Sequence, residues 1–179
     1  KAKDLVRMAV AKVTFGDSLK PISVPITQKS LVIGGGVAGM TAALNLAEQG
    51  FEVHLVEKTD TLGGNALNLK HTWAGEHVPT QVAKLVDKVI WNDKTIIHKE
   101  CTVTEVEGFV GNFRSTITGR DGVTKVIEHG AGVVATGGDA YVPTEYNYDS
   151  ITGVVTSVQF DKLFELKEKH VKRAKRFAF

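Results

Sequence analysis

The stretch LVIGGGVAGMTAALNLAEQGFEVHLVEK, residues 31–58, constrains the fold of this chain more than any other segment. The apolar run 30–33 is typical of a strand buried in a parallel sheet, and glycines interrupt it at once. Residues 38–49 are then expected to form a helix that ends before Gly50, a favourable residue just beyond a helix C-terminus. Residues 52–57 form a second apolar strand. The segment therefore predicts a β-α-β unit with parallel strands and a right-handed crossover.

Three glycines follow the first strand with the spacing G-x-G-x-x-G, and they are Gly34, Gly36 and Gly39. In such a turn the first glycine permits a tight bend and the second lets a pyrophosphate approach the backbone. The third lets the helix pack close to the strand. The free N–H groups and the positive end of the helix dipole then face the phosphates. The place of the turn between a strand and a helix favours a dinucleotide site over a glycine turn without a ligand.

Glu57 closes the second strand and indicates which dinucleotide is bound. A carboxylate at this place accepts hydrogen bonds from the ribose hydroxyls of an adenosine, and it repels a 2′-phosphate. The sequence therefore favours FAD or NAD over NADP.

Later features favour FAD over NAD. Gly63 and Gly64 form a second glycine pair just after the second strand. In an FAD protein, the loop at this place lies beside the pyrophosphate. A β-rich segment at about 101–130 then predicts a small antiparallel meander, with a turn at 119–122. The apolar run within 131–138 re-enters the sheet and stops at an Ala-Thr-Gly turn. Flavoproteins that bind two dinucleotides have these features in this order.

The length of 179 residues is sufficient for one domain with a hydrophobic core. We expect an α/β fold of the Rossmann-like, FAD/NAD(P)-binding type over residues 29–158, incomplete in itself. An N-terminal amphipathic helix and an extended linker occupy 1–28, and a basic helix occupies 159–179. A further helix is predicted at 79–91, where Pro79 suits the first turn.

The composition argues against several classes of protein. No run of about 18 apolar residues occurs, so no insertion into a membrane is expected. The net charge of +2 hides a local feature, because residues 167–176 carry six Lys or Arg and one Glu. We interpret this segment as a solvated helix end and expect no nucleic-acid binding, since no RNA-binding motif accompanies it. The sequence opens on Lys1 rather than Met, so we expect it to be part of a longer protein.

Neither a metal site nor a catalytic side chain is predicted. The histidines, at 54, 71, 77, 98, 129 and 170, do not have the spacing of metal ligands. Cys101 is the only cysteine, so we interpret it as a small buried hydrophobe. Trp73 and Trp91 are expected to be core or interface anchors. The absence of a Ser-His-Asp or paired-carboxylate pattern is compatible with a flavoenzyme, in which the cofactor supplies the redox chemistry.

Five segments together resemble the A subunit of heterodisulfide reductase and its relatives in sulfate reducers. They are KAKDLVRMAVAK, the stretch 31–58, LGGNA, GFVGNF and ATGGDAYVPTEYNY. The resemblance covers nearly the whole chain. The glycine turn and the Ala-Thr-Gly turn are generic to FAD proteins of the glutathione-reductase type. The leading helix, GFVGNF and PTEYNY are more particular to this family.

The resemblance implies a cytoplasmic iron–sulfur flavoprotein subunit that passes electrons from a donor subunit to the disulfide-reducing B and C subunits. It implies a glutathione-reductase-type fold of three layers (ββα), with a parallel central sheet and a small meander. The chain corresponds to an N-terminal part of the FAD domain. Iron–sulfur clusters are expected only in other parts of the parent protein, because Cys101 has no cysteine partner. The second half of the FAD domain is expected to lie beyond Phe179, and apolar surface that it would cover favours self-association.

The resemblance also assigns roles to residues of the first glycine motif and the acid that follows it. Gly34, Gly36, Ala38 and Gly39 are expected to contact the phosphates of FAD. Glu57 is expected to hold the ribose.

Six further residues are expected to line the same cleft or to form the turn that passes under the FAD: Lys58, Gly63, Gly64, Val103, Thr136 and Gly137. Val103 lies where the strands of this family offer backbone hydrogen bonds to adenine, and a core valine is the alternative interpretation. Asn65 is a candidate neighbour of the flavin ring.

Three functions remain open on the sequence alone. The first is an FAD-binding redox module of a heterodisulfide-reductase-like complex. The second is a non-catalytic fragment that binds an adenine dinucleotide and docks to other subunits. The third is an NAD(P)H-binding oxidoreductase domain, against which the order of second glycine pair, meander and Ala-Thr-Gly turn argues.

Overall fold

Four parallel strands form the central sheet of the computed structural model, which describes residues 1–16, 23–166 and 173. The strands are β1 (Lys29–Ile33), β2 (Glu52–Val56), β3 (Thr95–His98) and β7 (Ala131–Val134). Their order across the sheet is β3-β2-β1-β7, and each neighbouring pair is parallel. The helix α2 (Val37–Glu48) connects β1 to β2, so the β-α-β unit predicted from the glycine turn is present.

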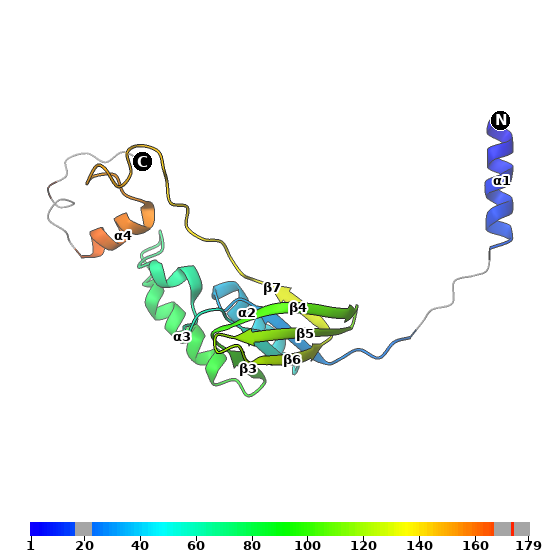
Figure 1. The fold of residues 1–179 in the computed structure, drawn as a ribbon, viewed down its shortest axis with the longest axis horizontal. Coiled ribbons are helices and arrows are strands. Elements are labelled where there is room, and N and C mark those ends of the chain that lie inside the picture. Colours follow the sequence, from blue (N-terminus) through cyan, green and yellow to red (C-terminus); the bar gives the residue numbers. More distant parts are fainter. Residues whose placement is uncertain (17–22, 167–172, 174–179) are drawn as a thin grey trace.

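Two helices, α2 and α3 (Val78–Ile90), cover one face of this sheet (Figure 1). A short 3₁₀ helix, η1 (Gly64–Asn68), packs beside α3. Six members of the larger hydrophobic core are completely shielded from solvent: Val32, Met40, Ala43, Val53, Leu55 and Val89. Burial of a Val, Leu or Met side chain contributes about 1.5–3 kcal/mol, so this layer is a main source of stability.

An antiparallel meander covers the opposite face of the parallel sheet (Figure 1). Its strands are β4 (Cys101–Phe109), β5 (Asn112–Gly119) and β6 (Thr124–His129), in that order. A second apolar core lies between the two sheets and contains Leu31, Val56, Ile117 and Ile127. The predicted meander and the three-layer arrangement of helices, parallel sheet and meander are therefore confirmed.

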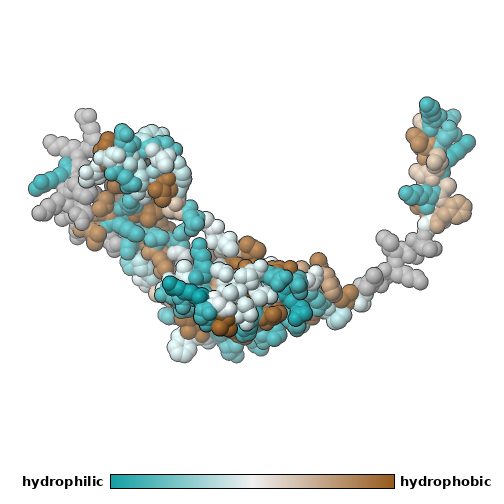
Figure 2. All heavy atoms as spheres, viewed as in Figure 1, coloured by the Kyte–Doolittle hydropathy of each residue, from teal (hydrophilic) through white to brown (hydrophobic). Residues whose placement is uncertain are grey.

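The two terminal helices are α1 (Ala2–Thr14) and α4 (Ser157–Glu165). The predicted amphipathic N-terminal helix is present as α1, but none of its residues is buried, and its hydrophobic side chains are visible in Figure 2. The helix predicted at 159–179 is described only through α4, Leu166 and Arg173, and the rest of that basic segment lies outside the described residues. No helix in the described parts of the chain combines the length and apolarity needed to cross a membrane.

Several apolar side chains differ from the sequence expectations. Trp73 is 100% exposed and Trp91 is 86% exposed, so neither anchors the core, and a role as interface anchors stays a prediction. Trp73 lies in the loop before α3 and Trp91 lies one residue beyond α3, where neither core cluster extends. Cys101 is half-buried at the edge of the meander core, and its Sγ–H donates to the Lys99 carbonyl oxygen at 3.1 Å. It is therefore less shielded than expected.

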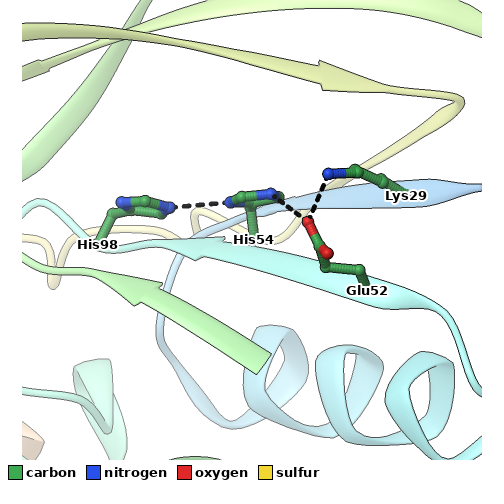
Figure 3. A network of polar contacts seen from close by, with 4 residues as sticks. All are labelled: Lys29, Glu52, His54 and His98. Carbon is green, nitrogen blue, oxygen red and sulfur yellow. Dashed lines mark hydrogen bonds and ion pairs between the residues drawn. The ribbon is translucent and has the colours of Figure 1, made fainter. Parts of the chain in front are cut away.

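A chain of polar side chains crosses three neighbouring strands of the parallel sheet (Figure 3). Lys29 Nζ lies 2.8 Å from Glu52 Oε1, and the same oxygen lies 3.1 Å from His54 Nε2. His54 Nδ1 lies 3.0 Å from His98 Nε2, and the two rings stack with their centroids 5.3 Å apart. Because a carboxylate only accepts, His54 donates its Nε2–H to Glu52. The bare Nδ1 of the neutral His54 ring then accepts from His98.

Burial favours the neutral form of both imidazoles in this chain. Burial is the main cause that lowers the pKa of His98 to about 4, and positive charge on His54 and Lys125 lowers it further. Burial also lowers the pKa of His54, although the neighbouring Glu52 carboxylate opposes this. At neutral pH, the network therefore consists of neutral imidazole hydrogen bonds attached to one ion pair.

Candidate functional site

The first glycine turn joins the carboxyl end of β1 to α2. Gly34 has a φ of +109°, which side chains rarely allow, and its N–H donates to the Val56 carbonyl oxygen at 2.8 Å. A Cβ atom added at Gly39 would lie 1.8 Å from the Gly34 carbonyl oxygen. The tight bend and the close helix packing that the spacing predicts are both present.

Gly36 differs from the other two glycines of the motif because it faces open space. It precedes the first turn of α2 with extended backbone, and no heavy atom lies within 4 Å of a Cβ built there. The first four N–H groups of a helix have no partner within the helix, and they carry partial positive charge. Ala38 in this first turn is also exposed. The space in front of Gly36, which a side chain would fill, is therefore open to an anionic ligand.

Glu57 lies one residue beyond β2, beside the glycine turn, and it is 7% exposed. Its Oε2 accepts a hydrogen bond from the Gly35 N–H at 2.6 Å. Its Oε1 accepts from the N–H and from the hydroxyl of Thr59, both at 2.8 Å. The carboxylate is thus fixed at the carboxyl ends of β1 and β2, where open α/β sheets bind their ligands.

The surroundings of Glu57 keep its carboxylate ionised. Burial raises the pKa of this group, but hydrogen bonds from Thr59 and Gly35, with help from the charge of Lys58, hold the pKa below its usual value. Sequence reasoning did not identify Thr59 as part of the site. The only available signal was its position, since a threonine two residues after an acid can reach back with both its N–H and its hydroxyl.

The second glycine pair lies directly against the first turn. The Gly63 N–H donates to the Gly35 carbonyl oxygen at 2.8 Å, and Gly63 forms an isolated parallel bridge with Gly36. A Cβ added at Gly64 would lie 3.1 Å from the Gly36 Cα. The Leu-Gly-Gly loop therefore runs beside the glycine turn, which is the placement that the FAD interpretation requires.

The Ala-Thr-Gly turn follows β7 on the other side of β1. The Ala135 N–H donates to the Ile33 carbonyl oxygen at 2.8 Å. A Cβ added at Gly34 would lie 2.3 Å from the Ala135 carbonyl oxygen, so this turn also packs against the glycine turn. Thr136 and Gly137 come next in the chain and are exposed at the same edge of the sheet.

Asn65 connects the second glycine loop to the segment after β7. Its side-chain amide donates to the Gly138 carbonyl oxygen. The segments that follow β1, β2 and β7 therefore contact one another in a ring at the carboxyl end of the sheet. A position of Asn65 near a flavin ring stays a prediction.

An open cleft of about 550 Å³ lies between the segment after β2 and the meander. Lys58 lines one side of it, and Thr102 and Thr104 of β4 line the other. Val103 lies between these two threonines and is half-buried, with its side chain packed against the meander core. Because β4 is an edge strand, alternate backbone groups along it are unused by β5 and are available to a ligand. The cleft thus begins at Lys58, the residue after Glu57, and runs along the part of β4 that contains Thr102 and Thr104.

Residues 28–177, which include every candidate residue, match the model of the pyridine nucleotide-disulphide oxidoreductase family. The second form of the iron–sulfur A subunit of CoB–CoM heterodisulfide reductase in Methanopyrus kandleri is 47% identical over 115 residues, or 63% of this chain and 17% of that relative. The iron–sulfur A subunit of CoB–CoM heterodisulfide reductase in Methanocaldococcus jannaschii is 34% identical over 153 residues, or 82% of this chain and 23% of the relative. These similarities confirm the resemblance seen in the sequence segments. The chain spans only between 17% and 23% of the length of these two relatives.

One solved structure extends the similarity to the fold. The L-proline dehydrogenase from P. horikoshii is 28% identical and superimposes with a TM-score of 0.55, over 69% of this chain and 25% of that chain. The family match covers both glycine pairs, the acid after β2, the meander and the Ala-Thr-Gly turn. Since it extends over more than half of the sequence, this chain belongs to the pyridine nucleotide-disulphide oxidoreductase family.

Proposed function

We propose that this chain is the FAD-binding part of an oxidoreductase subunit similar to the A subunit of heterodisulfide reductase. In this proposal the protein relays electrons through a flavin to iron–sulfur partner subunits. The observation that carries the proposal is the presence of Gly36 and Glu57 at one edge of the sheet. Open backbone at a helix N-terminus suits a pyrophosphate, and an ionised carboxylate beside it suits the ribose of an adenosine.

The residues of the first turn and its acid have distinct roles in this proposal. The turn that contains Gly34, Gly36, Ala38 and Gly39 holds the phosphates through the N–H groups at the start of α2, while the Gly34 N–H itself donates to the Val56 carbonyl oxygen. Glu57 accepts hydrogen bonds from the ribose hydroxyls.

The remaining candidate residues are assigned to the walls of the site. Lys58 and the edge strand around Val103 border the adenine, in the cleft beside Glu57. The second glycine pair and the Ala-Thr-Gly turn border the pyrophosphate and the flavin, through Gly63, Gly64, Thr136 and Gly137.

The ring of three segments supports FAD over NAD, since the adenosine contacts alone would suit both. The second glycine loop bonds to the first turn, and the Ala-Thr-Gly turn packs against it. Both segments lie beyond the adenosine side of the site, where FAD continues into a flavin. The residues present therefore fit the cofactor implied by the family.

When bound, a flavin supplies the hydride and electron chemistry. The residues of this chain bind the adenosine half and fix its orientation. None of the assigned residues is required to donate or accept a proton in the redox step.

The names of the relatives support partner subunits. Both relatives are called iron–sulfur subunits of a heterodisulfide reductase, so we assign iron–sulfur clusters to other parts of the parent protein. The expected partners, in the cytoplasm, are the B and C subunits together with an electron-donor subunit. Several apolar side chains of α1 are exposed, such as Leu5, Met8 and Val13, and they support docking to such an assembly or self-association.

The test of the proposal is flavin retention by the purified chain. We would record its visible absorbance before and after incubation with FAD and desalting. Flavin bands that survive desalting support the proposal. A colourless protein contradicts FAD binding by this chain and leaves the non-catalytic fragment as its function. Binding of NADH in competition with FAD favours the NAD(P)H domain instead.

Two glycine variants form a matched pair for this test. Gly36 and Gly153 both face open space, and neither has a positive φ, so a valine at either position adds a side chain without backbone strain. We expect Gly36→Val to weaken FAD binding by at least about tenfold, because the side chain fills the space assigned to the pyrophosphate. Gly153→Val is expected to bind FAD like the unmodified chain. Equal affinities for the two variants would contradict the assigned phosphate site.

A further inference from the structure

We infer that the hydroxyl of Thr59 competes with a ribose hydroxyl for Glu57, and that it turns to the Thr61 carbonyl oxygen when an adenosine binds. The inference rests on the proposed function and adds a residue that sets the affinity for the ribose. Thr59 is a positioning residue in this scheme, because it acts through Glu57.

The number of acceptor sites on Glu57 creates the competition. A carboxylate offers about four acceptor sites, two on each oxygen. Both sites of Oε1 are used in the structure, by the N–H and the hydroxyl of Thr59, and one site of Oε2 is used by the Gly35 N–H. About one site remains, on Oε2. A ribose brings two adjacent hydroxyls, so the second hydroxyl must displace a donor that is already bound.

The Thr59 hydroxyl is the donor that can leave. The backbone N–H groups of Gly35 and Thr59 are held by the turn and the loop that contain them. The hydroxyl instead rotates about one bond, and it already lies 2.8 Å from the carbonyl oxygen of Thr61. Because a hydroxyl has one proton, it donates either to Glu57 or to Thr61 at any moment.

The position of Thr59 makes this exchange accessible to a ligand. Thr59 is exposed and lines the cleft beside Glu57, whereas the Glu57 carboxylate itself is buried. A hydrogen bond to a charged carboxylate is stronger than one to a neutral carbonyl. Moving the Thr59 hydroxyl from Glu57 to the Thr61 carbonyl oxygen therefore costs free energy. This cost reduces the binding free energy that the second ribose hydroxyl contributes.

The substitution Thr59→Val tests the exchange because it removes the hydroxyl and keeps the backbone N–H and the shape. ADP, which has both ribose hydroxyls, and 2′-deoxy-ADP, which has one, would be titrated into the chain by calorimetry. The single hydroxyl of 2′-deoxy-ADP uses the free site, so its Kd is expected to stay unchanged. ADP is expected to bind about fivefold more tightly to the variant. The ratio of the Kd for 2′-deoxy-ADP to the Kd for ADP is therefore expected to rise about fivefold.

Two further variants control for the side chain and the loop. Thr59→Ser keeps a hydroxyl, so the ratio of Kd values is expected to return to that of the unmodified chain. Thr61→Val keeps the carbonyl oxygen that receives the hydroxyl, and it is expected to leave the ratio unchanged.

The outcomes separate this inference from the proposed function. If Thr59 only supports the loop, Thr59→Val weakens both nucleotides alike, and an unchanged or smaller ratio overturns the inference. Retention of FAD by the unmodified chain together with an unchanged ratio overturns the inference alone. Failure of the unmodified chain to bind FAD or ADP overturns the proposed function, and the inference with it.

Discussion

The Glu57 carboxylate accepts a hydrogen bond of 2.6 Å from the backbone N–H of Gly35, which lies 22 positions earlier in the chain. The contact joins the segment after β2 to the turn after β1. A Cβ added at Gly35 would lie 3.0 Å from Glu57 Oε2 and 2.5 Å from Leu62 Cδ2, so a side chain at this position would displace the acid. The acceptor assigned to the ribose is therefore ordered before any ligand binds, which reduces the entropic cost of binding.

The substitution Glu57→Gln tests whether this acid contributes to both stability and binding. The amide keeps the shape of the side chain but directs an NH₂ group toward a backbone N–H of Gly35 or Thr59. We expect a loss of about 1–3 kcal/mol in the free energy of unfolding, because a buried donor then lacks an acceptor. We also expect at least about tenfold weaker FAD binding, because a charged acceptor is lost. Urea unfolding followed by circular dichroism and a fluorescence titration with FAD measure the two effects.

Glu107→Gln is the control for this substitution, because Glu107 is exposed on β4. It is expected to change neither measurement. If Glu57→Gln behaves like Glu107→Gln, the buried acid is not the ribose acceptor.

A second prediction separates packing from binding within the glycine motif. Gly39→Ala places a Cβ 1.8 Å from the Gly34 carbonyl oxygen, so α2 must shift away from the turn. We expect this to cost about 1–3 kcal/mol in the free energy of unfolding. Gly36→Ala adds its Cβ to open space, so its stability is expected to stay within about 0.5 kcal/mol while FAD binding weakens. Thermal unfolding without ligand measures the stability of both variants. Equal unfolding temperatures for Gly39→Ala and Gly36→Ala would contradict the packing role of Gly39.

The parts of the fold that sequence reasoning predicted are those that depend on local patterns. The glycine spacing, the apolar strands on either side and the acid after β2 all lie within residues 31–58. Their physical meaning is local, because a tight turn, a helix start and a strand end each need particular residues nearby. The meander was predicted for the same reason, from β-rich segments with a turn at 119–122.

The features that sequence reasoning missed depend on contacts between distant segments. The pairing of His54 with His98 needs β2 and β3 to be neighbours in a fixed register, which neither strand encodes alone. The bonds from Thr59 to Glu57 depend on the conformation of one loop. Trp73 and Trp91 were expected to anchor the core or an interface, but a large apolar side chain is buried within the chain only where another layer covers it.

The exposed indoles predict an unusual spectroscopic behaviour. Because Trp73 is 100% exposed and Trp91 is 86% exposed, their fluorescence in the folded chain is expected to resemble that of the unfolded chain. Urea should then change the tryptophan emission little across the transition that circular dichroism detects. Acrylamide quenching is expected to be similar in the folded and unfolded states. Protection of the folded chain from acrylamide that disappears on dilution would instead show that a second copy covers an indole.

The imidazole network predicts that the chain loses stability in mild acid. The pKa of His98 is lowered from 6.5 to about 4 by burial, and that of His54 is lowered as well. Between about pH 4 and pH 6.5, the histidines of the unfolded chain bind protons that the folded chain excludes, so the free energy of unfolding falls as the pH falls. The stability that the neutral His98 imidazole contributes is fully present above about pH 6.5, and it is lost progressively toward about pH 4.

Urea unfolding at about pH 7.5 and about pH 5 measures this effect while most carboxylates stay ionised. An unscreened shift of this size corresponds to about 3 kcal/mol, and solvent screens the half-buried His98, so we expect it to contribute about 1–2 kcal/mol over its full range. His98→Gln removes the titration but keeps a donor for His54 Nδ1, so it is expected to reduce the loss at the lower pH. His71→Gln, at an exposed position, is expected to leave the loss unchanged. If both variants lose as much stability as the unmodified chain, protonation of His98 is not the cause.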